Sequence, residues 1–336
     1  MVVKYKYSVA IQCMTYNHSK YITDALDGFV KQNTDFPFVI LLVDDASTDG
    51  EEKVISDYIE ENFNLGNKAI TYEKETEYAK ITYAQHKTNN NCFIVAMYLK
   101  YNHYLIGKKL DKLKYLEEWI DNSKYIALCE GDDYWIDCNK LQKQVDFLES
   151  KPDYSMCFHK AKIVNELNRD VPLKSHVIEN RDYTANELFY NWIVPTASML
   201  YRKEVMCFPY KKQERLLNGD INIVLTCAML GKIYAFNDTM SVYRMQSTGV
   251  TYNKKLQKQR ALKSPDHFLY IKDNFSNILS KRLINKSISQ AYWGRIFAQE
   301  TIINKIKDLL LSFCYHPIFT IKELLKFIKS FFNKEN

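Results

Sequence analysis

The chain of 336 residues has few of the residues that interrupt regular structure, since only 9 are glycine and 7 are proline. Such scarcity predicts long helices and strands joined by short connections. Hydrophobic residues make up 46% of the chain and charged residues 26%, a composition that excludes an intrinsically disordered protein. At this length the chain can bury a sizeable core, either in one large domain or in two ordinary ones.

The eight cysteines form neither a CxxC pair nor a compact cluster. This spacing excludes the common structural zinc sites and the dense disulfide frameworks of small secreted domains, so we expect reduced thiols in the core. No stretch approaches the ~18 uninterrupted apolar residues of a membrane-spanning helix. The N-terminal segment runs straight into a strand-like pattern without the features of a signal peptide. We therefore expect a cytoplasmic protein.

The net charge of +6 is modest, and it gives no reason to expect nucleic-acid binding. The C-terminal segment 320–332 is distinctive, because its apolar and basic residues separate onto different sides of a helix. The apolar side holds Ile321, Leu324, Leu325, Ile328, Phe331 and Phe332, with Lys322, Lys326 and Lys329 on or beside the opposite side. This pattern is typical of a helix lying on an anionic membrane. It also fits a helix packed on its own domain or on a second subunit, since amphipathicity alone does not distinguish these cases.

The first half of the chain alternates strand and helix patterns. Apolar runs predict strands over 8–14, 36–47, 68–74 and 124–129, and helical spacing predicts helices over 19–32, 51–63 and, in two pieces, 92–121. Ser19 is a candidate N-cap of the first helix. This order predicts an α/β fold with a mostly parallel sheet and helices on both faces.

The second half continues this pattern and then becomes helical. We expect strands over 154–164 and 194–202 and two short ones within 232–245, helices over 139–150 and 219–231, and only helices beyond residue 252. Residues 165–195 are polar and irregular. The sequence therefore predicts an α/β domain over 1–250 and a helical C-terminal extension with an amphipathic tail over 251–336.

Three polar clusters follow predicted strands of the first half. They are Thr15-Tyr16-Asn17, Asp44-Asp45 and Glu130-Gly131-Asp132-Asp133. Ligands of open parallel sheets bind beyond the carboxyl ends of the strands, so the clusters form one site if their strands are neighbours. Asp44 and Asp45 by themselves are equally well explained as a turn before a helix capped by Ser47 or Asp49. One of the two aspartates could instead accept hydrogen bonds from a base edge or a ribose hydroxyl.

The cluster at 130–133 is harder to explain as a solvated acidic turn. It lies between a predicted buried strand and Tyr134-Trp135, where burial would raise the pKa values of carboxylates unless a cation neutralises them. Mg²⁺ and Mn²⁺ prefer oxygen ligands, often one or two carboxylates plus substrate phosphates. Gly131 would let the backbone turn so that Glu130 and Asp132 face one ligand. The cluster therefore predicts a site for a metal and a diphosphate.

In this order, TYNHSKYITDALDGFVKQ, VDDASTDG and EGDDYW resemble the motifs of the family 2 glycosyltransferases, over residues 5 to 250. The resemblance implies the GT-A fold, a nucleotide-diphosphate sugar donor (UDP-linked as the first expectation) and a role in bacterial surface-polysaccharide synthesis. The DxD motif of that family stands here as Glu130-Gly131-Asp132, with glutamate at its first position. By resemblance, Asp132 would be the main ligand of Mn²⁺ or Mg²⁺, and Glu130 a ribose or metal contact.

The resemblance also assigns roles at the first two clusters. Thr15 and Tyr16 would border the nucleotide base, with the Tyr16 ring stacked on it. Asp45 would hydrogen-bond the base, with Asp44 nearby.

Two further positions of the resemblance lie late in the chain. The general base of the family is usually an aspartate of an acidic pair at the start of a late helix, which corresponds to Asp220; Gly219 replaces the expected glutamate. A carboxylate there also fits a helix start stabilised by the macrodipole. A Tyr-Arg pair corresponds to Tyr243-Arg244, with Gln246 where histidine often stands. Arg244 could contact the diphosphate or be an ordinary surface arginine.

The implied reaction is an inverting single displacement. Asp220 would take the proton of an acceptor hydroxyl, and the metal would neutralise charge on the departing diphosphate. The acceptor would be a glycan or a lipid-linked molecule, with Trp135, Trp192 and residues 165–200 offering aromatic faces unless they are core.

Two other functions remain open from the sequence. A non-catalytic sugar-nucleotide-binding or scaffold protein of the same fold is suggested by the departures at Glu130, Gly219 and Gln246. A nucleotidyltransferase should carry a glycine-rich, basic phosphate loop after the first strand, and TYNHSK lacks one.

Overall fold

The computed structural model describes residues 5–66, 71–107, 111–171, 177–246 and 254–332. Packing divides the chain into two compact units. The first unit comprises residues 1–183, 193–207 and 230–245, and the second comprises 184–192, 208–229 and 246–336. The division therefore differs from a single boundary at residue 250, because two segments from the middle of the chain belong with the C-terminal helices.

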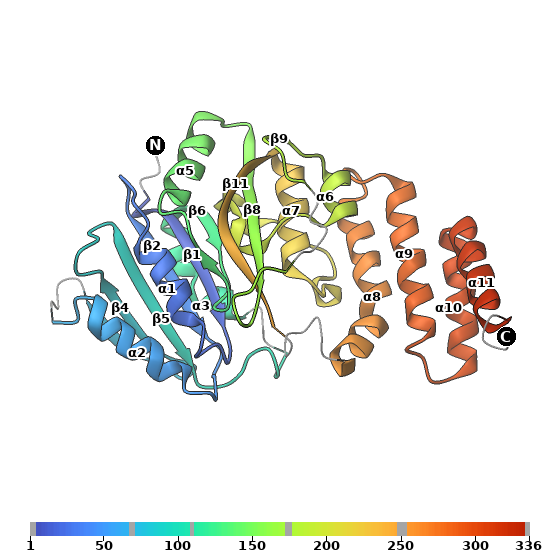
Figure 1. The fold of residues 1–336 in the computed structure, drawn as a ribbon, viewed down its shortest axis with the longest axis horizontal. Coiled ribbons are helices and arrows are strands. Elements are labelled where there is room, and N and C mark those ends of the chain that lie inside the picture. The colour runs from blue at the N-terminus through green and yellow to red at the C-terminus, as the bar shows by residue number, and fades with distance from the viewer. Residues whose placement is uncertain (1–4, 67–70, 108–110, 172–176, 247–253, 333–336) are drawn as a thin grey trace. The chain divides into compact units, whose positions relative to one another are not determined.

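The first unit contains one large sheet (Figure 1). Its strands are β1 (Tyr7–Thr15), β2 (Phe38–Asp44), β3 (Tyr72–Glu75), β4 (Ala79–Gln85), β5 (Cys92–Leu99), β6 (Ser123–Leu128), β7 (Tyr134–Trp135), β8 (Tyr154–Asn165), β9 (Arg181–Asp182), β10 (Leu200–Arg202) and β11 (Lys232–Met245). Their order is β3-β4-β5-β2-β1-β6-β10-β8-β11-β7, with β9 beside β11.

The centre of this sheet is parallel. β1 pairs in parallel with β2 and β6, and β2 pairs in parallel with β5. Antiparallel strands extend the sheet on both sides, with β4 beside β5 and β10 beside β6. All seven residues of β2 are buried, so both faces of the sheet are covered, as expected for parallel strands of continuous apolar sequence. The predicted α/β sheet covered on both faces is confirmed.

The helices of the first unit are α1 (Ile22–Val30), α2 (Glu51–Asn62), α3 (Asp111–Tyr115), α4 (Glu117–Asp121) and α5 (Lys140–Ser150). Their apolar residues recur at helical spacing, so that each longer helix has one apolar side. In α1 the side chains of Ile22, Leu26 and Phe29 are fully buried in the core beside β1 and β2.

The prediction of helices throughout 92–121 is wrong. Residues 92–99 form β5, in the parallel centre of the sheet, and of the described residues between it and 121 only those of α3 and α4 are helical. A short continuous apolar run fits a buried strand and a buried helix equally, and here pairing with β2 decides. β4 was not predicted at all. The segment 232–245 forms one strand with register shifts instead of two short strands.

Two smaller predictions also differ from the structure. Ser19 does not cap α1, whose N-cap is Tyr21 without a side-chain hydrogen bond; the Ser19 amide instead donates to Asp49 at 3.0 Å. The strand predicted over 68–74 begins at Tyr72, and residues 68–70 lie outside the described residues.

The second unit is helical (Figure 1). Its helices are α6 (Ala185–Asn191), α7 (Gly219–Leu230, of which Leu230 falls in the first unit), α8 (Lys254–Phe275), α9 (Lys281–Ile296), α10 (Ile302–Tyr315) and α11 (Pro317–Phe332). α7, α8 and α9 share an apolar core that includes Leu225, Tyr270 and Ile288. Ser280 and Thr301 cap α9 and α10 with their hydroxyl oxygens. The expectation of helices beyond residue 252 is confirmed for the described residues.

All eight cysteines are free thiols, as expected. Five are buried, but Cys138, Cys207 and Cys314 are exposed, so placement in the core was wrong for these three. Within the described ranges, no helix is both long enough and apolar enough to cross a membrane.

Candidate active site

The three polar clusters lie together at the carboxyl edge of the parallel strands. Thr15, the last residue of β1, pairs with Asp44, the last residue of β2. On the other side of β1, the chain leaving β6 remains hydrogen-bonded to it: the Gly131 amide donates to the Met14 carbonyl at 3.2 Å. We call this edge the candidate active site.

Gly131 is required by a close approach between two of the clusters. A Cβ atom added there would lie 2.7 Å from Cβ of Thr15 and 3.1 Å from Cδ1 of Ile22. The sequence interpretation attributed this glycine to a tight backbone turn. The structure gives a different reason, because the acidic loop lies directly against the end of β1.

Thr15 takes part in a buried network that the sequence interpretation missed. Its hydroxyl donates to the carboxylate of Glu51, which is fully buried in the first turn of α2. Glu51 also accepts hydrogen bonds from the His18 amide at 2.9 Å and from the Ser47 hydroxyl at 2.8 Å. Glu51 thus joins the segment after β1 to the segment after β2. The sequence feature that could have indicated this network is an acidic residue, Glu51, at the start of the helix predicted over 51–63.

Asp44 and Asp45 are both buried, but they have different partners. Oδ1 of Asp44 accepts a hydrogen bond from the Ser47 amide at 2.9 Å, which is the turn interaction considered from the sequence. Burial raises the pKa of Asp44 to about 6.

Asp45 connects the end of β2 to the segment that follows β5. Its carboxylate accepts hydrogen bonds from the backbone amides of His103 and Tyr104 at 2.7 and 3.2 Å, and it forms an ion pair with Lys112 at 2.8 Å. Contact between this carboxylate and a nucleotide base, as the resemblance implies, would add to these protein contacts.

The acidic residues of the cluster at 130–133 have three different environments. Glu130 is exposed, Asp132 is half-buried, and Asp133 is 2% exposed. Oδ1 of Asp133 accepts a hydrogen bond from the Arg244 amide at 2.9 Å. Burial, reinforced by the neighbouring charge of Asp132, raises the pKa of Asp133 well above its usual range. Asp133 therefore supports the loop from within, while Asp132 and Glu130 are accessible to a ligand.

His18 is a further residue of the candidate active site that the sequence interpretation did not name. Its Nε2 atom lies 3.8 Å from Oδ2 of Asp132, and its Nδ1 atom lies 3.2 Å from the Thr15 hydroxyl. The ring therefore stands between the end of β1 and the acidic loop.

Arg244 is buried, so the alternative of an ordinary surface arginine is wrong. Its side chain is 1% exposed and forms an ion pair with Asp24 at 2.7 Å. The guanidinium also donates to the Asp132 carbonyl at 2.6 Å and to the side-chain oxygen of Asn168. The rings of Tyr21 and Tyr134 lie 4.5 and 5.0 Å from it. Arg244 thus fixes the backbone of the acidic loop from β11.

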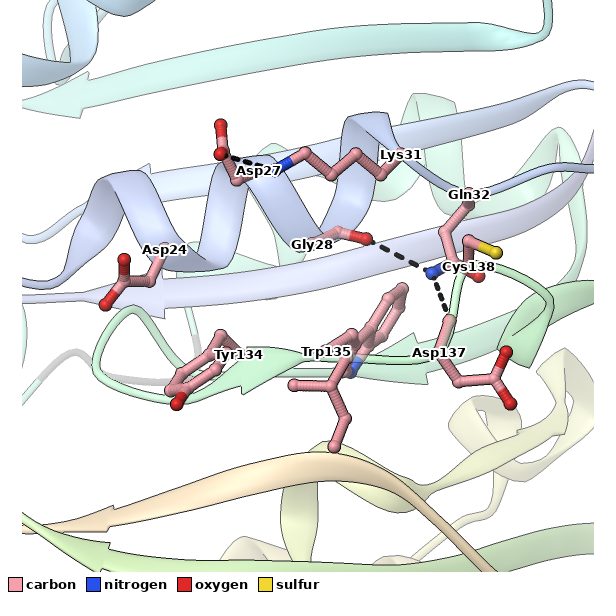
Figure 2. A pocket seen from close by; sticks show the side chains of 10 residues that line it. Asp24, Asp27, Gly28, Lys31, Gln32, Tyr134, Trp135, Asp137 and Cys138 are labelled. Carbon is pink, nitrogen blue, oxygen red and sulfur yellow. Dashed lines mark hydrogen bonds and ion pairs between the residues drawn. The ribbon is translucent and has the colours of Figure 1, made fainter. Parts of the chain in front are cut away.

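A cavity of about 340 Å³ lies between α1 and residues 134–138 (Figure 2). Two carboxylates that line it form ion pairs with lysine side chains: Asp27 with Lys31 and Asp137 with Lys143, each at 2.7 Å. Because these charges are already neutralised, the cavity lacks the features of a cation site.

Trp135 separates this cavity from the core beneath it. Its ring is 4% exposed and packs edge-on against Phe29, and its Nε1 atom donates to the Ala197 carbonyl at 2.9 Å. Of the two interpretations, Trp135 is therefore core. Trp192, in the second unit, is 40% exposed.

A divalent cation fits this edge only if the ligand supplies part of its coordination. Among the described residues, no group of three or more His, Cys, Asp or Glu side chains is placed to hold a metal. Asp132, with Glu130 beside it in sequence, offers the one or two carboxylates with which Mg²⁺ or Mn²⁺ binds nucleotide phosphates. The donor set is compatible with a metal held jointly with a diphosphate.

Asp220 belongs to the second unit, in the first turn of α7. Its Oδ1 atom accepts a hydrogen bond from the Ile221 amide at 2.9 Å, as a carboxylate at a helix start does. Burial raises its pKa, while the hydrogen bond from the Ile221 amide and the positive charge of Arg260 oppose this rise. Tyr16, in the first unit, is 38% exposed, which leaves its ring accessible for stacking.

Comparison with known proteins gives a family match at this edge. Residues 11–88 match the family model described as Glycosyl transferase family 2, a range that contains the first two clusters and Glu51. An uncharacterized protein of Mycobacterium tuberculosis is 25% identical over 259 residues, which are 77% of this chain and 65% of that protein. An uncharacterized glycosyltransferase of Mycoplasma genitalium is 31% identical over 137 residues, 40% of this chain and 34% of that protein. The chain thus spans less than two thirds of the length of either relative.

Solved structures of similar fold extend over most of the chain. Staphylococcus aureus TarS 1–349 superposes with a TM-score of 0.56 at 16% identity, covering 93% of this chain and 82% of that one. The mannosyltransferase PcManGT from Pyrobaculum calidifontis, in complex with GDP-Man and Mn²⁺, superposes with a TM-score of 0.52 at 12% identity, covering 97% and 80%. At such identities the likeness shows the fold, and the predicted GT-A-like architecture with C-terminal helices is confirmed.

Proposed function

Because the chain belongs to glycosyl transferase family 2, we propose that it transfers a sugar from a nucleotide-diphosphate sugar to a hydroxyl group of a glycan or lipid-linked acceptor. UDP is the first candidate nucleotide, since a structure of TarS 1–349 with UDP has the same fold. Surface-polysaccharide synthesis is the process in which we place this transfer.

The observation that carries the proposal is the convergence of three clusters on one sheet edge. Thr15, Asp44 and the loop around Asp132 come from three neighbouring parallel strands, where ligands of open α/β sheets bind. Tyr16, half exposed beside them, would stack on the base. Asp45, with Asp44 nearby, would hydrogen-bond the base.

In the proposed reaction, Asp132 and Glu130 would hold Mn²⁺ or Mg²⁺ together with the donor diphosphate. When bound, such a cation neutralises charge on the leaving group. Arg244 holds the backbone of this loop through the Asp132 carbonyl. Its contact with the diphosphate, implied by the resemblance, belongs to the same proposal.

Asp220 is the proposed general base, which removes the proton of the acceptor hydroxyl as this attacks the anomeric carbon. A carboxylate whose pKa is raised by burial is a stronger base than an exposed one, which suits proton removal near neutral pH. An inverting displacement of this kind needs no covalent enzyme intermediate, so no carboxylate nucleophile is assigned.

The decisive experiment separates donor binding from transfer. A panel of UDP- and GDP-sugars with Mn²⁺ is screened by thermal shift, because a ligand of the native state stabilises it by mass action. Nucleotide release is then measured for Asp132→Asn and Asp220→Asn. We expect Asp132→Asn to lose donor binding and Asp220→Asn to lose only turnover. If Asp220→Asn loses both equally, its role is the structural helix start.

A non-catalytic sugar-nucleotide-binding or scaffold protein is the second candidate. Glycine at position 219, where the family usually has glutamate, favours it, as does the exposed Glu130 at the start of the DxD-like motif. Steady nucleotide release by the wild type, abolished in Asp132→Asn, would exclude this candidate. If the donor stabilises the protein against thermal unfolding but no nucleotide is released with any acceptor, this candidate is supported.

The place of action that we propose is the cytoplasmic face of the plasma membrane, reached through residues 320–332. On α11 the side chains of Ile321, Leu325 and Ile328 are 47%, 53% and 42% exposed, and Lys322 and Lys329 are exposed near them. This arrangement suits an anionic bilayer surface. Deleting the chain after His316 should move the protein from the membrane fraction to the soluble fraction.

A further inference from the structure

A pocket of about 580 Å³ in the second unit has more basic than acidic side chains in its lining. Arg282 and Lys286 of α9 and Lys322 of α11 all line it. Within the described part of the chain, no carboxylate forms an ion pair with any of these three side chains. The lining carboxylate, Glu323, is bound to Lys326 at 2.6 Å. Three cations that share a pocket repel one another, and an anion placed among them would remove this repulsion.

Beside the pocket, α11 exposes one row of apolar side chains, and α10 exposes another; we call the two rows together the α10–α11 apolar face. Ile318, which lines the pocket, is 65% exposed. Ile321 and Leu325 continue its row along α11, while Ile303, Ile306 and Leu310 form a similar row on α10. On α10 these side chains are 53% to 78% exposed. Both rows follow helical spacing, so each is one side of a helix. Exposed apolar side chains gathered in rows of this kind mark surfaces that contact proteins or membranes.

The packing between these helices includes a buried polar cluster beside the apolar core. The hydroxyls of Ser289, Ser312 and Thr320 are buried together, with oxygen–oxygen distances of 2.8 to 3.3 Å. They join α9, α10 and α11. The hydroxyls satisfy one another inside, and Leu311 and Tyr315 of α10 pack against the apolar core. The exposed rows of α10 and α11 are additional to this packing, and they favour an apolar medium on that side of each helix.

We propose that the pocket binds the phosphate headgroup of an anionic lipid while the α10–α11 apolar face lies in the surface of the bilayer. Charge complementarity and continuity both support this occupant. Three cations suit a phosphodiester, and Ile318 connects the pocket to the surface that would meet the acyl chains. The inference rests on the membrane contact of the proposed function and assigns to it a headgroup site that the helix 320–332 alone does not contain.

Flotation of the full chain with liposomes tests the inference, using phosphatidylcholine vesicles with and without phosphatidylglycerol. The pocket variant is Arg282→Gln/Lys286→Gln. The matched control is Lys305→Gln/Lys307→Gln, which removes the same charge from α10, outside the pocket lining. We expect the wild type to bind only the anionic vesicles. Each lost positive charge weakens the general electrostatic attraction to these vesicles about fivefold, and this loss is the same in both double variants. The pocket variant should lose at least about tenfold more affinity than the control, because it also loses the headgroup site.

Each other outcome decides a different point. If wild type ignores anionic vesicles, the membrane contact itself is refuted. Equal losses in both doubles would leave a membrane contact without a headgroup pocket. If inorganic phosphate or glycerol phosphate stabilises wild type but not the pocket variant, without lipid, the site binds a soluble anion and the lipid assignment is overturned. Self-association that Ile321→Ser/Leu325→Ser abolishes, with no vesicle binding, would assign the apolar face to a second copy.

Stabilisation by UDP serves as the independent measure of folding and of the proposed function. Arg282 and Lys286 lie outside the candidate active site, so both variants should respond to UDP as wild type does. Wild type that binds anionic vesicles but no sugar nucleotide would refute the transferase proposal while leaving the headgroup pocket supported.

Discussion

Replacing Arg244 with alanine should destabilise the first unit and weaken donor binding together. The guanidinium is 1% exposed, whereas its partner Asp24 has a side chain that is 48% exposed. Water can therefore solvate Asp24 after the replacement, which lowers the cost below the 3–5 kcal/mol usual for breaking a fully buried pair. The Asp132 carbonyl and the Asn168 side chain would also lose a donor, at roughly 1 kcal/mol each.

With about 1 kcal/mol for the half-exposed ion pair itself, the sum is about 3 kcal/mol, which corresponds to a fall in Tm of about 6 °C for a cooperative unit of this size. Urea unfolding followed by tryptophan fluorescence would measure the change in the free energy of unfolding. Titration with UDP and Mn²⁺ would measure binding in the same variants. We expect donor affinity to fall because the Asp132 loop is no longer fixed.

Arg244→Lys and Arg169→Gln serve as comparisons. Lysine keeps the charge but cannot reach Asp24, Asn168 and the Asp132 carbonyl at once, so it should recover only part of the stability. Arg169 is exposed, and its replacement should change little. If Arg244→Ala lost donor affinity at unchanged stability, the proposed contact with the diphosphate would account for the whole loss, and the role in fixing the loop, argued from its burial, would be wrong.

Three further predictions concern the same edge. Gly131→Ala should lower the free energy of unfolding by about 1–3 kcal/mol and reduce UDP affinity, because the added Cβ would overlap Thr15. The matched control is Gly66→Ala, since a Cβ added at Gly66 meets nothing within 4 Å. Equal effects of the two replacements in urea unfolding would contradict the packing argument. Asp44→Asn should stabilise the protein at pH 7. Because the pKa of Asp44 is raised to about 6 on folding, wild type binds the extra proton between about pH 4 and 6 and loses stability as pH rises through that window, whereas the variant should lack this slope. Glu51→Gln should lower the free energy of unfolding, measured with urea, by about 2 kcal/mol, because the three groups that donate to the carboxylate would meet an uncharged amide with a single acceptor oxygen. An unchanged free energy of unfolding would mean that the network is not formed.

The strands around the candidate active site could be predicted because burial on both faces leaves a clear pattern. β1, β2 and β6 are short apolar runs that end in polar residues, and those ends proved to lie side by side. The apolar run at 92–99 is of the same kind, but it led to the wrong prediction of a helix. An apolar stretch of eight residues fits a strand or a buried helix, and only its parallel pairing with β2 made it β5.

The partners of charged residues could not be predicted, because they come from distant parts of the chain. Arg244 meets Asp24 across 220 positions, and Asp45 meets Lys112 across 67. An arginine near the end of a strand looks the same in sequence whether it is exposed or buried. The segments 184–192 and 208–229 likewise joined the helical unit through packing that no local pattern records.

The amino-acid order by itself determined most helices and strands, β4 and β5 excepted, and the chemistry available at the strand ends, since periodicity and turn residues are local properties. It placed three acidic and hydroxyl-bearing clusters after three strands and an amphipathic helix near the C-terminus. The tertiary structure alone decided which of these carboxylates are accessible. It buried Asp133 and Asp45 with partners of their own and left Asp132 and Glu130 accessible at the edge. Burial depends on which distant segments pack together, and the free energy of a buried charge depends on the partner that those segments supply.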